Sequence, residues 1–368
     1  MSQRRCPRCQ SVYVAPARFC TKDGAPLVDV AGPFSGAKPV GPPVVAQGGA
    51  AVRAHSGAPL PPPPTAQPLP PDAASVLTGS VLDARYQIER KVGEGGMAYV
   101  YLASELATGE RLAIKVLSPR LAGDQTSVER LKREAGVAMR LDHPNICRIL
   151  RLGQSPDGLF YLVMPFLDGE VLNDREARTG QFSLVDGLPL LVQVCRGLQH
   201  AHDLGILHRD LKPENVMLVP DPEAPGGQRA VVMDFGLAKE LVHDPARRRL
   251  TTTGIVLGTP EFMSPEQIRG KALDARSDIY ALGIVAFELF AGDLPFDGKT
   301  SQDKMIARLR GQPTMLRTLR PDLPPRLEAV LARALAMDPA NRYPTMLAFG
   351  DALEAVIEPG LLARLFRR

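Results

Sequence analysis

The amino-acid sequence predicts an α+β fold with two lobes, in which a small β-rich lobe precedes a larger helical lobe. Residues 86–115 indicate the small lobe, because apolar and polar residues alternate there as in β-strands. After Ser183 the apolar residues recur at helical spacing instead. A chain of 368 residues is long enough for a two-lobed domain of about 250–300 residues together with additional segments.

The expected elements follow one another in a simple order along the chain. Strands are predicted at 86–90, 100–103 and 112–115, a helix at 127–140 and a further strand at 159–164. No run of 18 apolar residues is present, so no transmembrane segment is expected. The predicted helices of the larger lobe span 183–204, 274–291, 301–310, 325–336 and 345–357.

Composition divides the chain into four segments. Residues 1–29 hold three of the five cysteines, and residues 30–79 are rich in Pro, Ala and Gly with few large apolar residues. Such a stretch cannot bury a hydrophobic core, so we expect a disordered linker there. The domain with continuous apolar periodicity spans 80–357, and a basic tail follows at 358–368.

Charge and cysteine content narrow the classes of function. The formal net charge is only +4, which argues against a general nucleic-acid or membrane binder. Five cysteines cannot all pair in disulfides, which indicates a reducing compartment. The polar N-terminus lacks the apolar core of a signal peptide. We therefore expect a cytoplasmic protein.

Two motifs in the second half of the chain carry the chemistry. The first is H-R-D-L-K-P-E-N at His208–Asn215, and the second is D-F-G at Asp234–Gly236. The first places an aspartate, a lysine and an asparagine on one tight loop. Phosphoryl transfer needs a carboxylate to orient a hydroxyl, a cation on the transferring phosphate and two oxygen ligands for magnesium. The two motifs together supply all of these groups.

A glycine-rich turn and a lysine lie upstream of these motifs. The turn, G-E-G-G-M-A-Y-V at Gly93–Val100, falls between two predicted strands, and its glycines allow the backbone to approach a triphosphate closely. Lys115 follows on the next strand, where it would meet the α- and β-phosphates. Glu134, on the helix predicted at 127–140, would pair with Lys115. Taken alone, the turn also fits a plain hairpin, and Glu134 also fits a surface charge.

Residues 86–357, about three-quarters of the chain, resemble a eukaryotic-type protein kinase domain. The resemblance is greatest to the bacterial Ser/Thr kinases, which share G-E-G-G-M at the turn and H-P-N-I after the first large helix. It implies a bilobal kinase fold, the use of ATP and Mg²⁺, and protein substrates. It also implies that Asp210 accepts the hydroxyl proton and that Lys212 stabilises the transferring phosphate, as in Ser/Thr-directed kinases. Asn215 and Asp234 would hold magnesium.

The resemblance further implies an ATP site with two departures from the usual pattern. Pro165 stands where glutamate is commoner, but only its carbonyl is needed, and Leu167 would supply the N–H. Ala98 replaces a glycine, which should alter the mobility of the turn rather than abolish activity. The residues expected to contact ATP are Val92, Gly93, Glu94, Gly95, Gly96, Met97, Ala98, Tyr99, Val100, Ala113, Lys115, Met164, Pro165, Leu167 and Met217.

The stretch after the D-F-G motif matches the activation segment of the family. Thr251 and Thr253 lie in it, and their phosphorylation would add negative charge that orders the loop. Exposed threonines that no enzyme modifies are the alternative. We expect autophosphorylation in trans, with a homodimer as the reacting species. The resemblance also implies that Glu266 pairs with Arg342 and that Asp278 anchors the catalytic loop.

The N-terminal cysteines predict a small metal site. Two knuckle-like turns, at Cys6–Cys9 and at Cys20–Gly24, are separated by ten residues. One tetrahedral zinc ion bound at two such turns can close a hairpin that has no core of its own. The segment resembles short zinc ribbons that end in F-C-x-x-D-G, and a metal-free disordered segment is the alternative. We expect a protein partner for this ribbon rather than nucleic acid. The expected zinc ligands are Cys6, Cys9, Cys20 and Asp23.

Together these observations predict an active Ser/Thr protein kinase that transfers the γ-phosphate of ATP to protein hydroxyls in signal transduction. A pseudokinase scaffold that binds ATP without transfer is one alternative, although every required side chain is present. A zinc-ribbon nucleic-acid adaptor is another, and its binding would weaken steeply with salt. A small-molecule phosphotransferase is disfavoured, because the long activation segment serves protein substrates.

Overall fold

The computed structural model describes residues 3–5, 12–14, 28–29, 73–95, 98–118, 125–235 and 260–356. The chain divides into two compact units, residues 1–65 and 66–368, and both predicted lobes belong to the second unit. Most of the predicted linker and the whole basic tail fall outside the described residues. So do the individual predictions for Cys6, Cys9, Cys20, Asp23, Gly96, Met97, Thr251 and Thr253.

The first unit contains a three-stranded antiparallel sheet in the order β2-β1-β3. Its strands are β1 (Gln3–Arg5), β2 (Val12–Val14) and β3 (Val28–Asp29). Arg5, at the end of β1, pairs with Val12 on one side and with Val28 on the other. The connection 6–11 therefore leaves the sheet at the same end to which the connection 15–27 returns.

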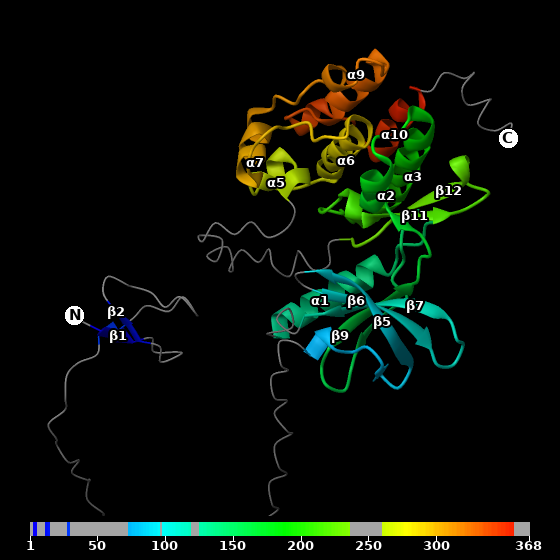
Figure 1. Ribbon diagram of the computed structural model, residues 1–368, viewed down its shortest axis with the longest axis vertical. Coiled ribbons are helices and arrows are strands. Elements are labelled where there is room, and N and C mark those ends of the chain that lie inside the picture. The colour runs from blue at the N-terminus through cyan, green and yellow to red at the C-terminus, as the bar shows by residue number, and fades with distance from the viewer. Residues whose placement is uncertain are drawn as a thin grey trace, which may run out of the picture. The chain divides into compact units, whose positions relative to one another are not determined.

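The small lobe is a six-stranded antiparallel sheet in the order β4-β5-β6-β7-β9-β8, with helix α1 packed beside it (Figure 1). Strand β7 shows how the sequence forms this sheet. Leu112, Ile114 and Val116 are buried in the core of the lobe, whereas Ala113 and Lys115 alternate to the other face. The elements are β4 (Val81–Leu82), β5 (Tyr86–Gly95), β6 (Ala98–Glu105), β7 (Arg111–Leu117), α1 (Gln125–Ala138), β8 (Arg151–Gln154) and β9 (Phe160–Pro165).

The packing of the small lobe extends to residues before Ser80, where we expected the domain to begin. A 3₁₀ turn at Ala73–Ser75 lies against the sheet, and Ala74 is fully buried there. The Tyr101 hydroxyl donates a 2.8 Å hydrogen bond to the Ala74 carbonyl. The Gly79 N–H donates to the Ile88 carbonyl at 2.9 Å, which continues the contact toward β4. Residues 73–79 are therefore part of the folded lobe.

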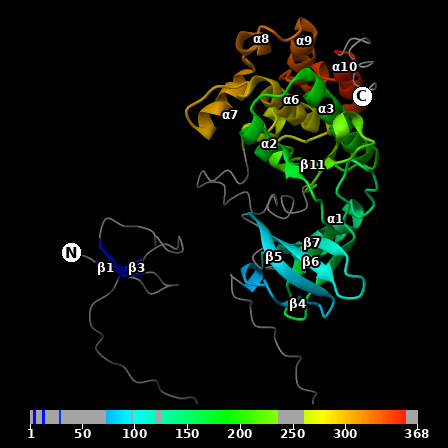
Figure 2. The same ribbon diagram turned by 45° about the vertical axis from the view of Figure 1, so that its right-hand side comes forward.

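The large lobe is helical, as predicted, and is built around α6 (Ala275–Ala291), which is buried along almost its whole length (Figure 2). Asp274 caps the start of this helix through the Arg276 N–H, and Gly292 ends it with a φ of 71°. The other helices are α2 (Leu172–Thr179), α3 (Leu184–Asp203), α5 (Pro265–Ile268), α7 (Ser301–Arg310), α8 (Leu316–Leu319), α9 (Pro325–Ala334) and α10 (Met346–Glu354).

The large lobe also contains a small antiparallel sheet, β10-β11-β12, that the sequence did not predict. Its strands are β10 (Glu170–Val171), β11 (Val216–Pro220) and β12 (Gln228–Val232). The stretch 220–228 is the turn of the β11–β12 hairpin, because Pro220 pairs directly with Gln228. This hairpin connects the two chemical motifs, so it fixes the distance between them.

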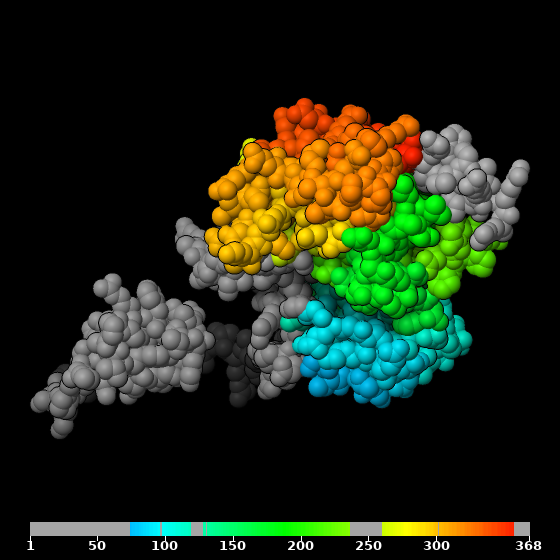
Figure 3. All heavy atoms as spheres, turned by 45° about the horizontal axis from the view of Figure 1, so that its top comes forward, coloured from blue at the N-terminus to red at the C-terminus, as the bar shows by residue number. Residues whose placement is uncertain are grey.

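The two lobes form the upper and lower halves of the second unit, with the small lobe in blue and cyan and the large lobe in green to red (Figure 3). Strand β9 is the last strand of the small lobe in the sequence, and the chain then passes to β10 and α2 of the large lobe. Among the described residues, no helix combines the length and the apolar character needed to cross a membrane.

Candidate active site

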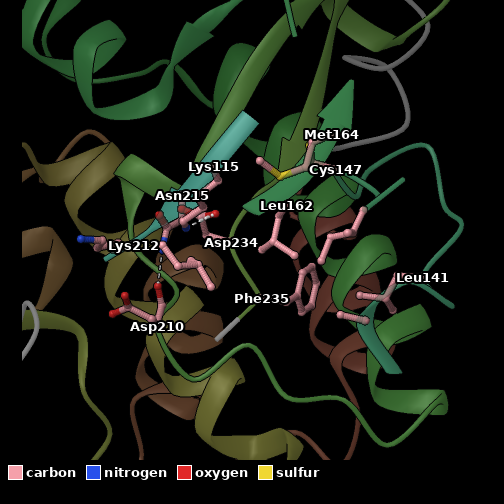
Figure 4. Close-up of a pocket in the computed structure, with 13 residues that line it drawn as sticks. Lys115, Leu141, Cys147, Leu162, Met164, Asp210, Lys212, Asn215, Asp234 and Phe235 are labelled. Carbon is pink, nitrogen blue, oxygen red and sulfur yellow. Dashed lines mark hydrogen bonds and ion pairs between the residues drawn. The ribbon is translucent and has the colours of Figure 1, made fainter. Parts of the chain in front are cut away.

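A pocket of about 170 Å³ lies where the last strands of the small lobe meet the loops after α3 and β12 (Figure 4). Its charged and amide side chains gather on one side, and its apolar side chains gather on the other. The pocket is lined by Lys115, Leu117, Ala138, Leu141, Cys147, Ile149, Leu162, Met164, Asp210, Lys212, Asn215, Asp234 and Phe235. Six of these residues were predicted from the two motifs and their upstream partners: Lys115, Met164, Asp210, Lys212, Asn215 and Asp234.

Other residues expected to contact ATP do not line this pocket in the described part of the chain. Several of them are placed beside it by the sheet register. Ala113 on β7 pairs with Met164 on β9, and Val100 on β6 pairs with Lys115 on β7. Those outside the lining are Val92, Gly93, Glu94, Gly95, Ala98, Tyr99, Val100, Ala113, Pro165, Leu167 and Met217.

Asn215 stabilises the catalytic loop, residues 208–215, through two hydrogen bonds. The Asn215 side-chain N–H donates a 2.7 Å hydrogen bond to the Asp210 carbonyl. The Asn215 carbonyl in turn accepts the Met233 N–H at 2.8 Å. These two bonds hold the loop of Asp210 beside the strand that leads to Asp234. Because Nδ2 is used in this way, the Oδ1 atom of Asn215 is the oxygen that remains for a ligand.

Asp278, at the start of α6, anchors the same loop, as the sequence predicted. Its carboxylate accepts the His208 N–H and the Arg209 N–H, each at 2.9 Å. Arg209 has a φ of 64°, a strained value for a residue with a side chain. His202 on α3 lies 2.7 Å from the same carboxylate through Nε2. The side chains of His202 and Asp278 are only 4% and 1% exposed, so these bonds lie in the interior.

His208 is held as a neutral ring with a defined tautomer. Burial lowers the pKa of His208, so the uncharged imidazole is favoured. Its Nε2 lies 2.8 Å from the Met233 carbonyl, and its Nδ1 accepts the Asp210 N–H at 3.3 Å. Only the Nε2–H tautomer satisfies both contacts. The ring also packs on Phe235 with 4.9 Å between centroids, which brings the two motifs into contact.

Lys115 reaches across the pocket to the aspartate of the second motif. Its Nζ lies 2.6 Å from Oδ1 of Asp234, as the dashed line in Figure 4 marks. Desolvation opposes ionisation of Asp234, but the charge and hydrogen bond of Lys115 outweigh it and lower the pKa of that carboxyl. The expected partner, Glu134, lies on α1 and does not line the pocket. Pairing between Lys115 and Glu134 stays a prediction.

A buried ion pair fastens the segment that precedes α6, as predicted. Arg342 donates to both carboxylate oxygens of Glu266, at 2.7 and 2.9 Å. The Ser277 hydroxyl donates to Glu266 as well, at 2.7 Å. The guanidinium also lies over the Tyr280 ring, 4.7 Å from its centroid. This network fixes the start of α5 against α6.

Cys147 and His202 are site residues whose roles the sequence did not reveal. Cys147 lines the pocket and is only partly buried. Burial raises the pKa of its thiol to about 12, so the thiol stays protonated. His202 lies six residues before His208, and this proximity to the motif was the available signal for its contact with Asp278.

Comparison with known proteins agrees with this geometry. Residues 86–352 match the family described as protein kinase domain. The serine/threonine-protein kinase pkn3 of Myxococcus xanthus is 38% identical over 280 residues, which cover 76% of this chain and 51% of that protein. The kinase PrkC of Bacillus subtilis is 37% identical over 270 residues, covering 73% and 40%. The chain thus spans about half or less of the length of these two curated relatives.

Solved structures give the same result. The kinase domain of Mycobacterium tuberculosis PknI matches with a TM-score of 0.59 and 31% identity over 76% of this chain and 99% of that one. The crystal structure of Rad53 in complex with AMP-PNP matches with a TM-score of 0.58 and 26% identity, covering 74% and 64%. The chain therefore belongs to the protein kinase family and contains a bacterial-type serine/threonine kinase domain.

Proposed function

We propose that this protein is an active Ser/Thr protein kinase that transfers the γ-phosphoryl group of ATP to protein hydroxyls. The observation that carries the proposal is the convergence of Lys115, Asp210, Lys212, Asn215 and Asp234 on one pocket. These residues come from both lobes, and Lys115 and Asp234 are 119 positions apart in the sequence. A pseudokinase that only binds ATP would not need the complete set of charged groups.

Each side chain would have a distinct task in the transfer. Asp210 accepts the proton of the substrate hydroxyl while the oxygen of that hydroxyl forms a bond to the γ-phosphorus. The bond from that phosphorus to the β–γ bridging oxygen breaks, and ADP leaves with the electron pair. Lys212 and Lys115 neutralise the negative charge on the phosphates. The anchoring of the loop by Asp278 keeps Asp210 in position while this happens.

Asn215 and Asp234 would hold Mg²⁺, which supplies positive charge at the β- and γ-phosphates when bound. The donor set fits this ion, because both side chains offer hard oxygen atoms. Asn215 has Nδ2 engaged with the Asp210 carbonyl, which turns Oδ1 to the free side of the amide. Asp234 is kept ionised by its depressed pKa.

The adenine would lie between the small-lobe sheet and β11. Val92, Val100 and Ala113 would supply the wall from the small lobe and Met217 the wall from the large lobe, while Pro165 would offer its carbonyl and Leu167 its N–H. The nucleotide complex of the structurally similar Rad53 supports this use of the cleft. The turn from Gly93 to Tyr99 would cover the phosphates.

The test is the intact mass of the purified protein after incubation with ATP and Mg²⁺, with Asp210→Asn as the matched control. An active kinase gains phosphates in the wild type and none in the variant. A thermal shift with ATP but no added phosphate would instead support the pseudokinase scaffold. A separate assay against added protein substrate decides whether activity depends on autophosphorylation.

Autophosphorylation in trans at Thr251 and Thr253 would switch the kinase on. Both residues lie outside the described part of the chain, and the proposal rests on their position after the D-F-G motif. A Thr251→Ala, Thr253→Ala double variant should lose most activity toward protein substrates while it still binds ATP. Full activity of this variant would remove the switch. Phosphate transfer from wild type to an Asp210→Asn copy would establish the trans reaction between two copies.

Residues 1–29 would form a zinc ribbon with Cys6, Cys9, Cys20 and Asp23 as ligands. The sheet register supports this, because the connection 6–11 and the returning connection 15–27 meet the sheet at the same end. Each connection contains one pair of the expected ligands. About one zinc per chain by elemental analysis, lost in Cys20→Ser, is the expected result. A wild-type protein without zinc would favour the metal-free alternative, and zinc retained in Cys20→Ser would remove Cys20 from the ligand set.

The linker, the C-terminal tail and the partner of the ribbon are part of the same proposal. Residues 30–72 would act as a linker between the ribbon and the kinase domain, and 358–368 as a basic tail. A protein partner would bind the ribbon and supply the activating signal. Cys147 and Cys195 are free thiols, which agrees with a reducing, cytoplasmic environment.

A further inference from the structure

Arg308 is a buried cation on α7 that pairs with no carboxylate in the described part of the chain. Its residue is only 1% exposed. Instead of an acid, it contacts backbone: its guanidinium donates to the Pro260 carbonyl at 2.6 Å and to the Glu261 carbonyl. Both carbonyls belong to the 3₁₀ turn Pro260–Phe262, which packs against α7. Burial of a cation without a direct ion pair is costly, so these two hydrogen bonds need an explanation.

Arg308 forms one end of a column in which two stacked aromatic rings lie between two arginines. Its guanidinium lies over the Phe296 ring, 5.4 Å from the centroid. Phe296 stacks on Tyr280 with 6.3 Å between centroids and 18° between planes. The Arg342 guanidinium lies over the Tyr280 ring, 4.7 Å from its centroid. Arg342 in turn holds Glu266.

The column therefore fixes the segment 260–266 at both of its ends. One arginine binds the backbone at its start, and the other binds the carboxylate near its end. Beyond that end, the Gln267 side chain donates a 2.9 Å hydrogen bond to the Arg209 carbonyl in the catalytic loop. In the ribbon view α7 lies directly beside α5 (Figure 1). A displacement of residues 260–262 would thus be transmitted through Gln267 to Arg209, which is next to Asp210.

We propose that Arg308 is a positioning residue for the protein substrate. Arg308 holds the segment 260–262 in a fixed position beside the catalytic loop. This proposal rests on the proposed kinase function and adds a determinant of acceptor binding to it. Because Arg308 donates its hydrogen bonds to main-chain carbonyls of the segment, it sets the path of the segment whatever the side chains of 260–262 are. It lies outside the nucleotide pocket, so ATP binding should not depend on it.

Three variants in the full-length chain separate this role from general stability. Arg308→Met keeps the length and the apolar stem but removes both donations. Arg308→Lys keeps the charge and can reach one carbonyl. Arg310→Ala, an exposed arginine two residues later on the same helix, is the matched control. Myelin basic protein serves as the acceptor, and the KM values for acceptor and for ATP are measured separately.

We expect Arg308→Met to raise the KM for myelin basic protein at least tenfold, with the KM for ATP within twofold of wild type. Arg308→Lys should be intermediate, and Arg310→Ala unchanged. Hydrogen exchange measures the position of the segment without any catalysis: the Met263 amide, which donates to the Pro260 carbonyl, should exchange at least tenfold faster in Arg308→Met alone. Equal rises in both KM values, or exchange like that of wild type, would overturn the proposal.

The two measurements keep this proposal distinct from the proposed function. If the wild type transfers no phosphate, the kinase assignment fails, and the exchange of Met263 still decides whether Arg308 holds the segment. If Arg308→Met does not fold, the same exchange and KM comparison is made with Arg308→Lys. An Arg308→Lys protein identical to wild type in both would then refute the role of the two hydrogen bonds.

Discussion

Replacement of Asp278 by Asn tests how the catalytic loop is held. The Asp278 carboxylate accepts three contacts: the His208 and Arg209 N–H groups on different oxygens, and Nε2 of His202. Asparagine has nearly the same size but offers one acceptor oxygen and one donor nitrogen. If its oxygen replaces the one shared by His208 and His202, its NH₂ group faces the Arg209 N–H, and two donors then meet without an acceptor.

The structure gives the size of the effect. Each hydrogen bond to a buried charged group contributes about 1.5–3 kcal/mol, and the variant loses one bond and gains a donor–donor contact. We therefore expect a loss of about 2–4 kcal/mol in the free energy of unfolding. At about 2–4 °C per kcal/mol for a domain of this class, Tm falls by roughly 4–16 °C. Release of the strained Arg209 backbone would displace Asp210, and a misplacement of about 1 Å costs on the order of 100-fold in kcat.

Urea unfolding and steady-state kinetics at pH 7.5 measure the two effects. Asp274→Asn is the matched control, because Asp274 caps the same helix and asparagine is an equally good N-cap. The control should stay within about 1 kcal/mol of wild type, since it loses only a surface pair with Arg276. The reasoning is refuted if Asp278→Asn matches this control in both stability and kcat.

Three further outcomes are expected from charged and thiol groups in the large lobe and the pocket. Burial, together with the charge of Glu288, raises the pKa of Glu176 to about 8, so the folded state keeps a proton that the unfolded state releases above pH 4.5. Stability is thus lost as pH rises through 8, and Glu176→Gln should raise Tm at pH 8.5 but not at pH 5. Glu266→Gln leaves Arg342 as an uncompensated buried cation, and urea unfolding at pH 7 should show a loss of about 3–5 kcal/mol. Because burial raises the pKa of Cys147 to about 12, mass spectrometry should detect alkylation of this thiol at pH 8 in urea but not in the native protein.

Long helices with a strong apolar period were predictable from sequence, because periodicity directly reports a buried face. The helix predicted at 183–204 is α3, Leu184–Asp203, and that predicted at 301–310 is α7. The sheet β10-β11-β12 was missed for the opposite reason. A two-residue strand and two five-residue strands are too short to show a period, and pairing between strands distant in sequence fixes them.

Contacts implied by the family motifs were also predictable, as for Glu266 with Arg342 and for Asp278 with the catalytic loop. The role of Arg308 was not predictable in this way. Its partners are main-chain carbonyls about 48 positions away, and a carbonyl carries no sequence signal. Sequence reasoning therefore identifies side chains that do chemistry better than those that fix the path of the backbone.

Lys115 shows that a motif can predict a functional side chain without predicting its ion-pair partner in the structure. The sequence predicts Glu134 as its partner, but Nζ lies 2.6 Å from Asp234. The two side chains are 17% and 39% exposed, so the pair contributes only on the order of 1 kcal/mol. In the proposed reaction Asp234 serves the metal and Lys115 serves the phosphates, so nucleotide binding must separate them. A pair this weak can be exchanged at little cost, which leaves α1 and its Glu134 as the natural alternative partner for the lysine.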